Sequence, residues 1–254
     1  MRLPRLLRRS VYRWRCSRLH GPDSSPLLAC FTHHKTGTVL FTEVLRDLSR
    51  AFDLRFHDGP QEDLRADADV WVENHSAVSF RELRRPYRGV HVIRDPRDMI
   101  VSGYRYHLRC REPWCLEPQG RLGGRSYQEY LSALSPEEGI LAEMERARHD
   151  LGEIQAWDFA NPMILEVKLE DVLERFRQEF SRIFRFYGFD EEGVEQALQV
   201  ARQHDIQCYS EERIRDDPHI HSPGIHKWRG VFSDTHKARF KELFPGLLAE
   251  LGYE

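Results

Sequence analysis

The stretch Thr32-His33-His34-Lys35-Thr36-Gly37-Thr38 decides the fold of this chain. A short apolar run over residues 27–31 precedes it, and apolar residues at helical spacing follow it between 39 and 48. A strand, a tight turn and the start of a helix, in this order, direct backbone N–H groups and the positive end of the helix dipole at one point. Because Lys35 adds a full positive charge there, the stretch predicts a phosphate-binding site.

The spacing of this stretch differs from that of a Walker A loop. His34 stands where that loop needs a glycine before its lysine, and the upstream glycine is absent. A P-loop-like kinase, which would also require Mg²⁺, is therefore the weaker phosphate-binding hypothesis. A lysine at a helix start is mildly unfavourable by itself, since its charge meets the positive end of the dipole. A bound anion explains Lys35 better than solvent does.

A second stretch, residues 90–102, has a similar design. The β-branched run 90–93 predicts a buried strand, Pro96 opens a helix, and Ser102 lies about two turns into that helix. Arg94 leaves the carboxyl end of the strand, which is where open α/β sheets bind their ligands. The alternative role for Arg94 is a local ion pair with the aspartates that follow it.

Together, Lys-Thr-Gly-Thr after the first strand and Arg-x-Pro-x-x-x-x-x-Ser after a later one resemble the PAPS-dependent sulfotransferases. In that family the first motif holds the 5′-phosphosulfate of 3′-phosphoadenosine 5′-phosphosulfate (PAPS), and the second holds its 3′-phosphate. The resemblance covers about residues 27–245. It implies that PAPS is bound at its two ends by Lys35, Thr36, Gly37 and Thr38 and by Arg94 and Ser102.

Two residues are candidates for the chemical step that the resemblance implies. Lys35 would neutralise the bridging oxygen as the S–O bond breaks. His75, at the end of the predicted strand 69–74, would take the proton of the attacking hydroxyl, because an imidazole titrates near neutral pH. Cytosolic members carry this histidine in a Lys-x-His setting, whereas Glu73 replaces the lysine here. Glu73 is the alternative base, and a capping or core role is the alternative for His75.

The C-terminal part of the resemblance lies in residues 221–229. Many sulfotransferases fold an Arg-Lys-Gly-x-x-Gly-x-Trp-Lys segment over the nucleotide, and here its first three residues are replaced by His-Ser-Pro. Trp228 and the base after it are retained, and packing alone is the alternative role for Trp228. The resemblance implies contacts to the nucleotide from Ser222, the backbone of Gly224, Lys227, Trp228 and Arg229.

Two substitutions separate the chain from the cytosolic steroid and phenol enzymes. Leu169 stands where the family's Tyr-Glu-Asp strand end has its tyrosine, and Leu40 stands where a tryptophan is common after the first motif. Both changes remove aromatic rings that often lie near adenine. The resemblance is therefore closer to bacterial or carbohydrate-type members.

Strand and helix patterns alternate along the chain, which predicts an α/β fold with a mainly parallel sheet and helices on both faces. Residues 109–126 and 205–230 read as irregular loops, and the first of them follows the helix that begins at Pro96. Candidate residues lining an acceptor path are Tyr104, Tyr106, His107 and Trp114. Strands are expected at 27–32, 53–56, 69–74, 89–93 and 163–168, and helices at 38–51, 79–84, 96–108, 137–157, 170–187, 191–203, 234–243 and 246–251.

The composition supports one substantial core. The chain has 254 residues, 40% of them hydrophobic, and a formal charge of −3, which argues against a general nucleic-acid binder. Its five cysteines are scattered and odd in number, which favours reduced thiols, and no metal-ligand set is evident. A disulfide or a metal site at Cys110 and Cys115 is the alternative. The sequence has no run of 18 apolar residues, so no membrane span is predicted. Residues 1–25 read as a basic arm, either frayed, targeting an organelle or touching an anionic surface, and the cytoplasm is the expected location.

These observations predict a single three-layer α/β domain over residues 26–254, with P-loop-like nucleotide binding. The expected reaction transfers the sulfuryl group of PAPS to a hydroxyl or amine, without a metal. The acceptor class stays open between a glycan, a lipid and a small alcohol, because acceptor loops vary on one scaffold. A catalytically inactive protein that binds PAPS or its product PAP is the second hypothesis, and the kinase is the third.

Overall fold

The computed structural model describes residues 26–210, 212 and 224–254. The expected basic arm over residues 1–25 and the candidate ligand Ser222 lie outside these described residues. The chain forms two compact units. Among the described residues, 26–93 and 158–210 belong to the first unit, and 94–157, 212 and 224–254 belong to the second.

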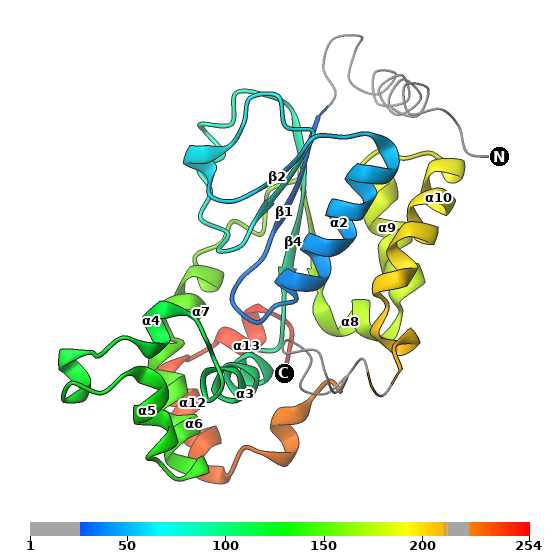
Figure 1. Ribbon diagram of the computed structural model, residues 1–254. Helices are drawn as coiled ribbons and strands as arrows, with labels where there is room; N and C mark the ends of the chain where they lie inside the picture. The colour runs from blue at the N-terminus through cyan, green and yellow to red at the C-terminus, as the bar shows by residue number, and fades with distance from the viewer. Residues whose placement is uncertain (1–25, 211, 213–223) are drawn as a thin grey trace. The chain divides into compact units, whose positions relative to one another are not determined.

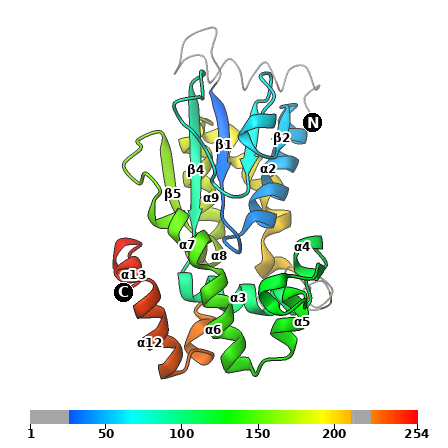
Figure 2. The same ribbon diagram turned by 90° about the vertical axis from the view of Figure 1, so that its left-hand side faces the viewer.

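A five-stranded parallel sheet forms the centre of the first unit, in the order β2-β3-β1-β4-β5. Every neighbouring pair is parallel, and Figure 2 shows β5, β4 and β1 side by side, with β2 further along the sheet. The carboxyl ends of all strands therefore meet at one edge of the sheet, which confirms the predicted α/β class with a parallel sheet. The strands are β1 (Leu27–Phe31), β2 (Phe56–Asp58), β3 (Val70–Glu73), β4 (Tyr87–Ile93) and β5 (Ile164–Lys168).

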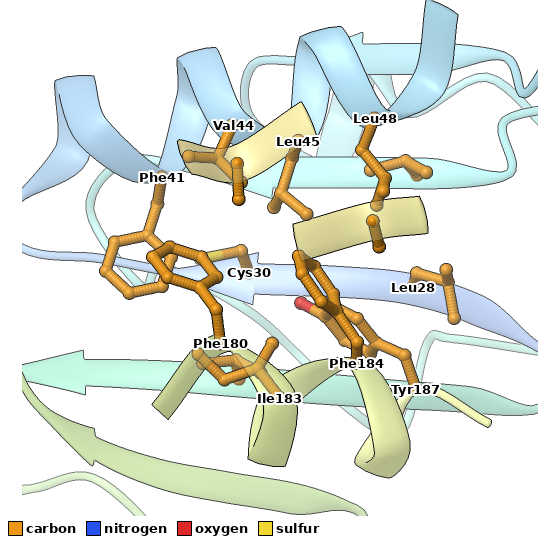
Figure 3. Packing of buried hydrophobic residues seen from close by; sticks show 14 of the residues in the cluster. Leu28, Cys30, Phe41, Val44, Leu45, Leu48, Phe180, Ile183, Phe184 and Tyr187 are labelled. Atoms are coloured by element: carbon orange, nitrogen blue, oxygen red, sulfur yellow. The ribbon is translucent and has the colours of Figure 1, made fainter. Parts of the chain in front are cut away.

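Helices cover one face of this sheet, and the main core lies between the sheet and these helices (Figure 1). Figure 3 shows Leu28 and Cys30 of β1 facing side chains of α2 such as Leu45 and of α9 such as Phe184. The hydroxyl of Tyr187, inside this core, donates to the carbonyl of Ala29 at 2.7 Å, so its polar atom is satisfied. The helices of this unit are α2 (Thr38–Phe52), α8 (Leu169–Glu174), α9 (Phe176–Phe186) and α10 (Glu191–Ala201), with short 3₁₀ turns at Gln61–Asp63, Arg202–His204 and Ile206–Cys208.

An aromatic cluster includes Phe31 and Trp71, which alternate along β1 and β3 with residues of the main core. The ring of Phe31 meets Trp71 and Phe80 edge-on at centroid distances of 5.5 and 5.6 Å, and Phe80 stacks on Tyr87 at 5.4 Å. Phe80 belongs to residues 79–84, for which a helix was predicted. That prediction is wrong, because the segment is a turn. The packing of Phe80 between Phe31 and Tyr87 sets the path of this segment instead.

The second unit is helical among its described residues. Asp95 caps α3 by accepting from the N–H of Arg97, and Ser135 forms a capping box at the start of α6. Where α3 and α6 cross, a Cβ on Gly103 would lie 2.5 Å from a carboxylate oxygen of Glu143, so the close approach requires glycine. The helices are α3 (Pro96–His107), α4 (Pro113–Leu116), α5 (Tyr127–Ser132), α6 (Pro136–Arg146), α7 (Arg148–Gln155), α12 (Asp234–Leu243) and α13 (Leu247–Glu250), with 3₁₀ turns at Gly120–Leu122 and Lys227–Gly230.

Several predicted boundaries differ from the structure. The helix expected over 137–157 is interrupted at Ala147, and the one expected over 170–187 is interrupted at Arg175, whose φ and ψ of −128° and 46° leave the helical region. Neither break has a glycine or proline that would have marked it. The strand expected at 53–56 lies at Phe56–Asp58, and the loop 109–126 contains α4 and a 3₁₀ turn. None of the described helices is both long enough and apolar enough to cross a membrane.

Candidate active site

Residues 32–38, the phosphate loop, follow β1 and are organised around the main chain of His33. The carbonyl of His33 accepts from the N–H of Thr36 at 3.1 Å and from the hydroxyls of Thr36 and Thr38 at 2.9 and 3.2 Å. The N–H of His33 in turn donates to the Thr36 hydroxyl at 2.8 Å. Since Thr36 is fully buried, its side chain braces the loop from inside, a role that the sequence pattern did not indicate.

The end of the phosphate loop presents an uncapped helix start. Gly37 precedes α2 with a φ of 99°, and no side chain caps the helix. The first turn of α2 contains no acidic residue, so nothing in the helix itself balances the positive end of its dipole. Lys35 is half-buried and has a φ of 67°, an uncommon backbone conformation for a residue with a side chain. An anion bound here would accept hydrogen bonds from the first N–H groups of α2 and would be attracted by the charge of Lys35.

The turn after β3 presents His75 and buries Glu73. One carboxylate oxygen of Glu73 accepts from the N–H groups of His75 and Ala77 at 3.0 and 2.8 Å, and the residue is only 2% exposed. Burial raises the pKa of Glu73 above its usual value. The His75 side chain is exposed. The geometry therefore gives Glu73 the task of shaping the turn and leaves the imidazole of His75 accessible to an acceptor.

The same turn is joined to the phosphate loop. The hydroxyl of Ser76 donates to the carbonyl of Thr32 at 3.0 Å, and the N–H of Thr32 donates to the carbonyl of Glu73 at 3.0 Å. His75 also interacts electrostatically with His33 and contributes to lowering the pKa of that residue. His75 and the loop that carries Lys35 thus belong to one continuous edge of the first unit.

The side chain of His33, within the phosphate loop, is connected to two polar side chains of the sheet, His91 and Glu166, which sequence reasoning missed. The Nε2 atoms of His33 and His91 are 2.8 Å apart, and Nδ1 of His91 is 2.6 Å from a carboxylate oxygen of Glu166. Burial, helped by His91 and then His75, lowers the pKa of His33 to about 3. Only the strand register could have found this group, because it pairs His91 with Phe31 on one side and with Glu166 on the other.

The second unit holds a cluster of cations that we call the cation cluster, made of Arg94, Arg105 and Lys227. Burial, then Arg94 and to a smaller extent Arg105, lower the pKa of Lys227 to about 8, while Asp98 opposes them. Arg94 is 7% exposed and lies 3.9 Å from a carboxylate oxygen of Asp98. The three cationic side chains supply positive charge of the kind that binds a phosphate.

Asp98 also fixes the segment that brings Lys227 to the cluster. Its other carboxylate oxygen accepts from the N–H of Trp228 at 2.9 Å. The guanidinium of Arg97 lies 3.8 Å from the centre of the Trp228 ring, and Arg97 itself is held by Asp95 at 2.9 and 2.8 Å. The guanidinium of Arg229 lies 5.8 Å from the centre of the same ring, so two arginines contact the indole. Ser102 and Arg229 are the other predicted ligands in this unit, half-buried and exposed respectively.

The predicted acceptor-lining residues have different surroundings. His107 is fully buried, with Nδ1 2.9 Å from a carboxylate oxygen of Glu143 and its ring against Trp114 and Tyr127. The expectation that His107 lines an acceptor path is wrong, because its imidazole belongs to the interior of the second unit. Trp114 is 38% exposed and remains a candidate. Within residues 26–210, 212 and 224–254, no group of His, Cys, Asp and Glu is arranged to hold a metal ion.

Two comparisons with known proteins found matches. A family model described as "Sulfotransferase domain" matches residues 79–252. Among solved structures, the chain is similar to mouse sulfotransferase SULT7A1, crystallised with PAP, with 15% sequence identity and a TM-score of 0.50. The likeness covers 89% of this chain and 86% of the mouse chain, and at this identity it shows the fold. No curated protein sequence matches the chain.

Proposed function

Because this chain belongs to the sulfotransferase domain family, we propose that it transfers the sulfuryl group of PAPS to a hydroxyl or amine of an acceptor. The observation that carries the choice of donor is the cation cluster. A nucleotide with phosphate only at its 5′ end would need only the phosphate loop. PAPS also has a 3′-phosphate, which would need a second group of cations. That SULT7A1 was crystallised with PAP supports the same donor.

The phosphate loop would bind the 5′-phosphosulfate. Gly37 and Thr38 offer N–H groups at the uncapped start of α2, and Thr36 keeps the loop in shape. Lys35 would stabilise the negative charge that develops on the bridging oxygen as its bond to sulfur breaks. His75 would take the proton from the acceptor as the new bond to sulfur forms, so that PAP leaves and the acceptor carries the sulfate.

The second unit would bind the 3′-phosphate. Arg94 and Lys227 supply charge, and Ser102 and Arg229 supply further donors. Trp228, whose ring is contacted by the guanidinium groups of Arg97 and Arg229, would pack beside the nucleotide. With Leu40 and Leu169 in place of aromatic residues, we group the protein with the bacterial or carbohydrate-type enzymes. A glycan, a lipid or a small alcohol would be the acceptor.

Calorimetric titration without added metal tests the donor. We expect PAP to bind to the wild-type protein and to bind far more weakly to Arg94→Ala. Adenosine 5′-phosphosulfate, which lacks the 3′-phosphate, should bind both proteins equally, because it does not need Arg94. Exposed Arg84, replaced by alanine, is the matched control and should leave PAP binding unchanged. Binding of ATP with Mg²⁺ in place of PAP would overturn the proposal.

A further inference from the structure

Glu166, His91 and His33 form a hydrogen-bonded row across the first unit. Glu166 lies on β5, His91 lies on β4, and His33 lies two residues beyond β1, inside the phosphate loop. His91 is completely buried, His33 is 2% exposed, and the Glu166 side chain reaches solvent with 28% of its surface. The row therefore runs from the surface of the sheet to the main chain that organises the phosphate loop.

The contacts of this row give each ring a definite tautomer. The Glu166 carboxylate can only accept, so Nδ1 of His91, 2.6 Å away, must carry the proton. In a neutral ring Nε2 of His91 is then bare and must accept from Nε2–H of His33 at 2.8 Å. As a result Nδ1 of His33 carries no proton. The direction of both hydrogen bonds is set from the Glu166 end.

The position of His33 matters because its backbone is the centre of the phosphate loop. Its carbonyl accepts from three donors of Thr36 and Thr38, and its N–H donates to Thr36. A shift of the His33 ring would move these bonds together. Lys35, two residues further on, is held in a left-handed conformation that the surrounding structure must maintain.

We propose that Glu166, acting through His91, positions His33 and so holds the phosphate loop in the shape that presents Lys35. Glu166, His91 and His33 are positioning residues, and the inference rests on the proposed function for the role of Lys35. Apolar side chains at the buried positions 33 and 91 would stabilise the fold without losing the hydration that buried polar groups lose. A fully bonded polar row instead defines one orientation.

Nitrogen-15 NMR of the histidine rings tests the row directly. In the wild-type protein we expect His91 protonated at Nδ1 only and His33 at Nε2 only. Replacing Glu166→Ala removes the acceptor, so His91 should return to the Nε2–H form and His33 should change to Nδ1–H, two hydrogen bonds away. A doubly protonated His91, or a His33 tautomer that does not respond to Glu166→Ala, would overturn the inference.

The loop and the reaction provide the second measurement. Glu166→Ala and His91→Asn, which keeps a donor near Glu166 but cuts the link to His33, should shift the backbone amide signals of residues 34–38. Both should lower turnover roughly tenfold, as loss of a supporting partner commonly does. Glu174→Ala, an exposed carboxylate on α8, is the matched control and should change neither. Unchanged loop signals in both variants would rule out the positioning role.

These readouts separate the two proposals. The ring and amide spectra report on the row whether or not PAP binds, and the PAP titration of the wild-type protein reports on the proposed function. Wild-type turnover in Glu166→Ala, together with the expected tautomer change, would show that the row does not support Lys35.

Discussion

The protonation of Lys227, in the second unit, should depend on whether a nucleotide is bound. Burial and the neighbouring guanidinium of Arg94 lower its pKa from its ordinary 10.5 to about 8, against the attraction of Asp98. A bound 3′-phosphate would add negative charge and favour the ammonium form, so the pKa of Lys227 should rise on binding. Protonation and nucleotide binding are then linked.

We therefore predict that PAP binding takes up protons at pH 8. With a free pKa of about 8, Lys227 is half neutral, and a raised pKa in the complex requires about half a proton per nucleotide. Calorimetry in buffers of different ionisation enthalpy measures this uptake. Lys227→Arg stays charged at this pH and should bind PAP without it. Equal uptake by both proteins would show that another group is responsible.

His75 carries the second prediction at this scale. Replacing His75→Ala should lower the rate of sulfuryl transfer by about 10²–10⁴-fold, because a positioned base contributes that much. PAP affinity should stay unchanged, since the side chain is exposed and is assigned to the acceptor. Single-turnover kinetics beside a PAP titration separates the two effects. A variant that transfers at the wild-type rate would end the assignment of His75 as the base.

His33 links the phosphate loop to acid stability. Its pKa is about 3 in the folded protein against an ordinary 6.5, so above pH 6.5 it is neutral in both states and adds no pH dependence. As the pH falls from 6.5 towards 3, the unfolded chain binds a proton that the folded one refuses, and stability is lost. At pH 5 the loss from His33 amounts to about 2 kcal/mol.

Urea unfolding at pH 7 and pH 5 measures this loss. The free energy of unfolding of the wild-type protein should fall between the two, and the fall should be smaller by about 2 kcal/mol in His33→Gln, whose side chain does not titrate. The comparison uses the difference between pH values, so a lower stability of the variant at pH 7 does not affect it. An identical fall in both proteins would mean that His33 is protonated when folded.

At the scale of the element, the start of α2 differs from the starts of α3, α5, α6, α10 and α12, each of which has a side-chain cap. Gly37 stands there with a φ of 99°, and a Cβ on it would lie 2.7 Å from Cδ1 of Leu169. Two separate constraints thus require glycine. One is the backbone conformation and the other is the approach of α8 to the loop.

A pair of alanine substitutions separates these constraints. Gly124 also has a positive φ, 80°, but a Cβ on it would meet nothing within 4 Å. We expect Gly124→Ala to cost about 1–2 kcal/mol from the backbone alone, and Gly37→Ala to cost more because Leu169 must move. Thermal unfolding measures the costs, and only Gly37→Ala should weaken PAP binding. A similar loss of PAP binding in both would point to general destabilisation.

The elements show which features a sequence can predict. Periodicity placed all five strands to within a few residues, and Pro96 marked the start of α3, because these signals are local. The breaks at Ala147 and Arg175 carry no local signal. His91 and Asp98 were missed as site residues for the same reason, since their roles come from strand register and from a segment 130 residues away in sequence.

At the scale of the whole molecule, the evidence for the two ends of the nucleotide differs in kind. The family model matches residues 79–252 and thus includes Arg94, Ser102 and Lys227. The phosphate loop and His75 precede that range, so their assignment rests on the motif and on the geometry of the first unit. The Arg94→Ala titration and the His75→Ala kinetics test the two parts separately.

The division of the chain also affects how it is made. Four strands of the sheet are complete at Ile93, but β5 begins only at Ile164, after about 70 residues that belong mostly to the other unit. At 5–20 residues per second, the ribosome needs roughly 4 to 14 s to supply the missing strand. During that time the β4 edge of the nascent sheet has no partner on one side and can pair wrongly. Slow translation or a chaperone that shields this edge would therefore change the yield of folded protein more than its final stability.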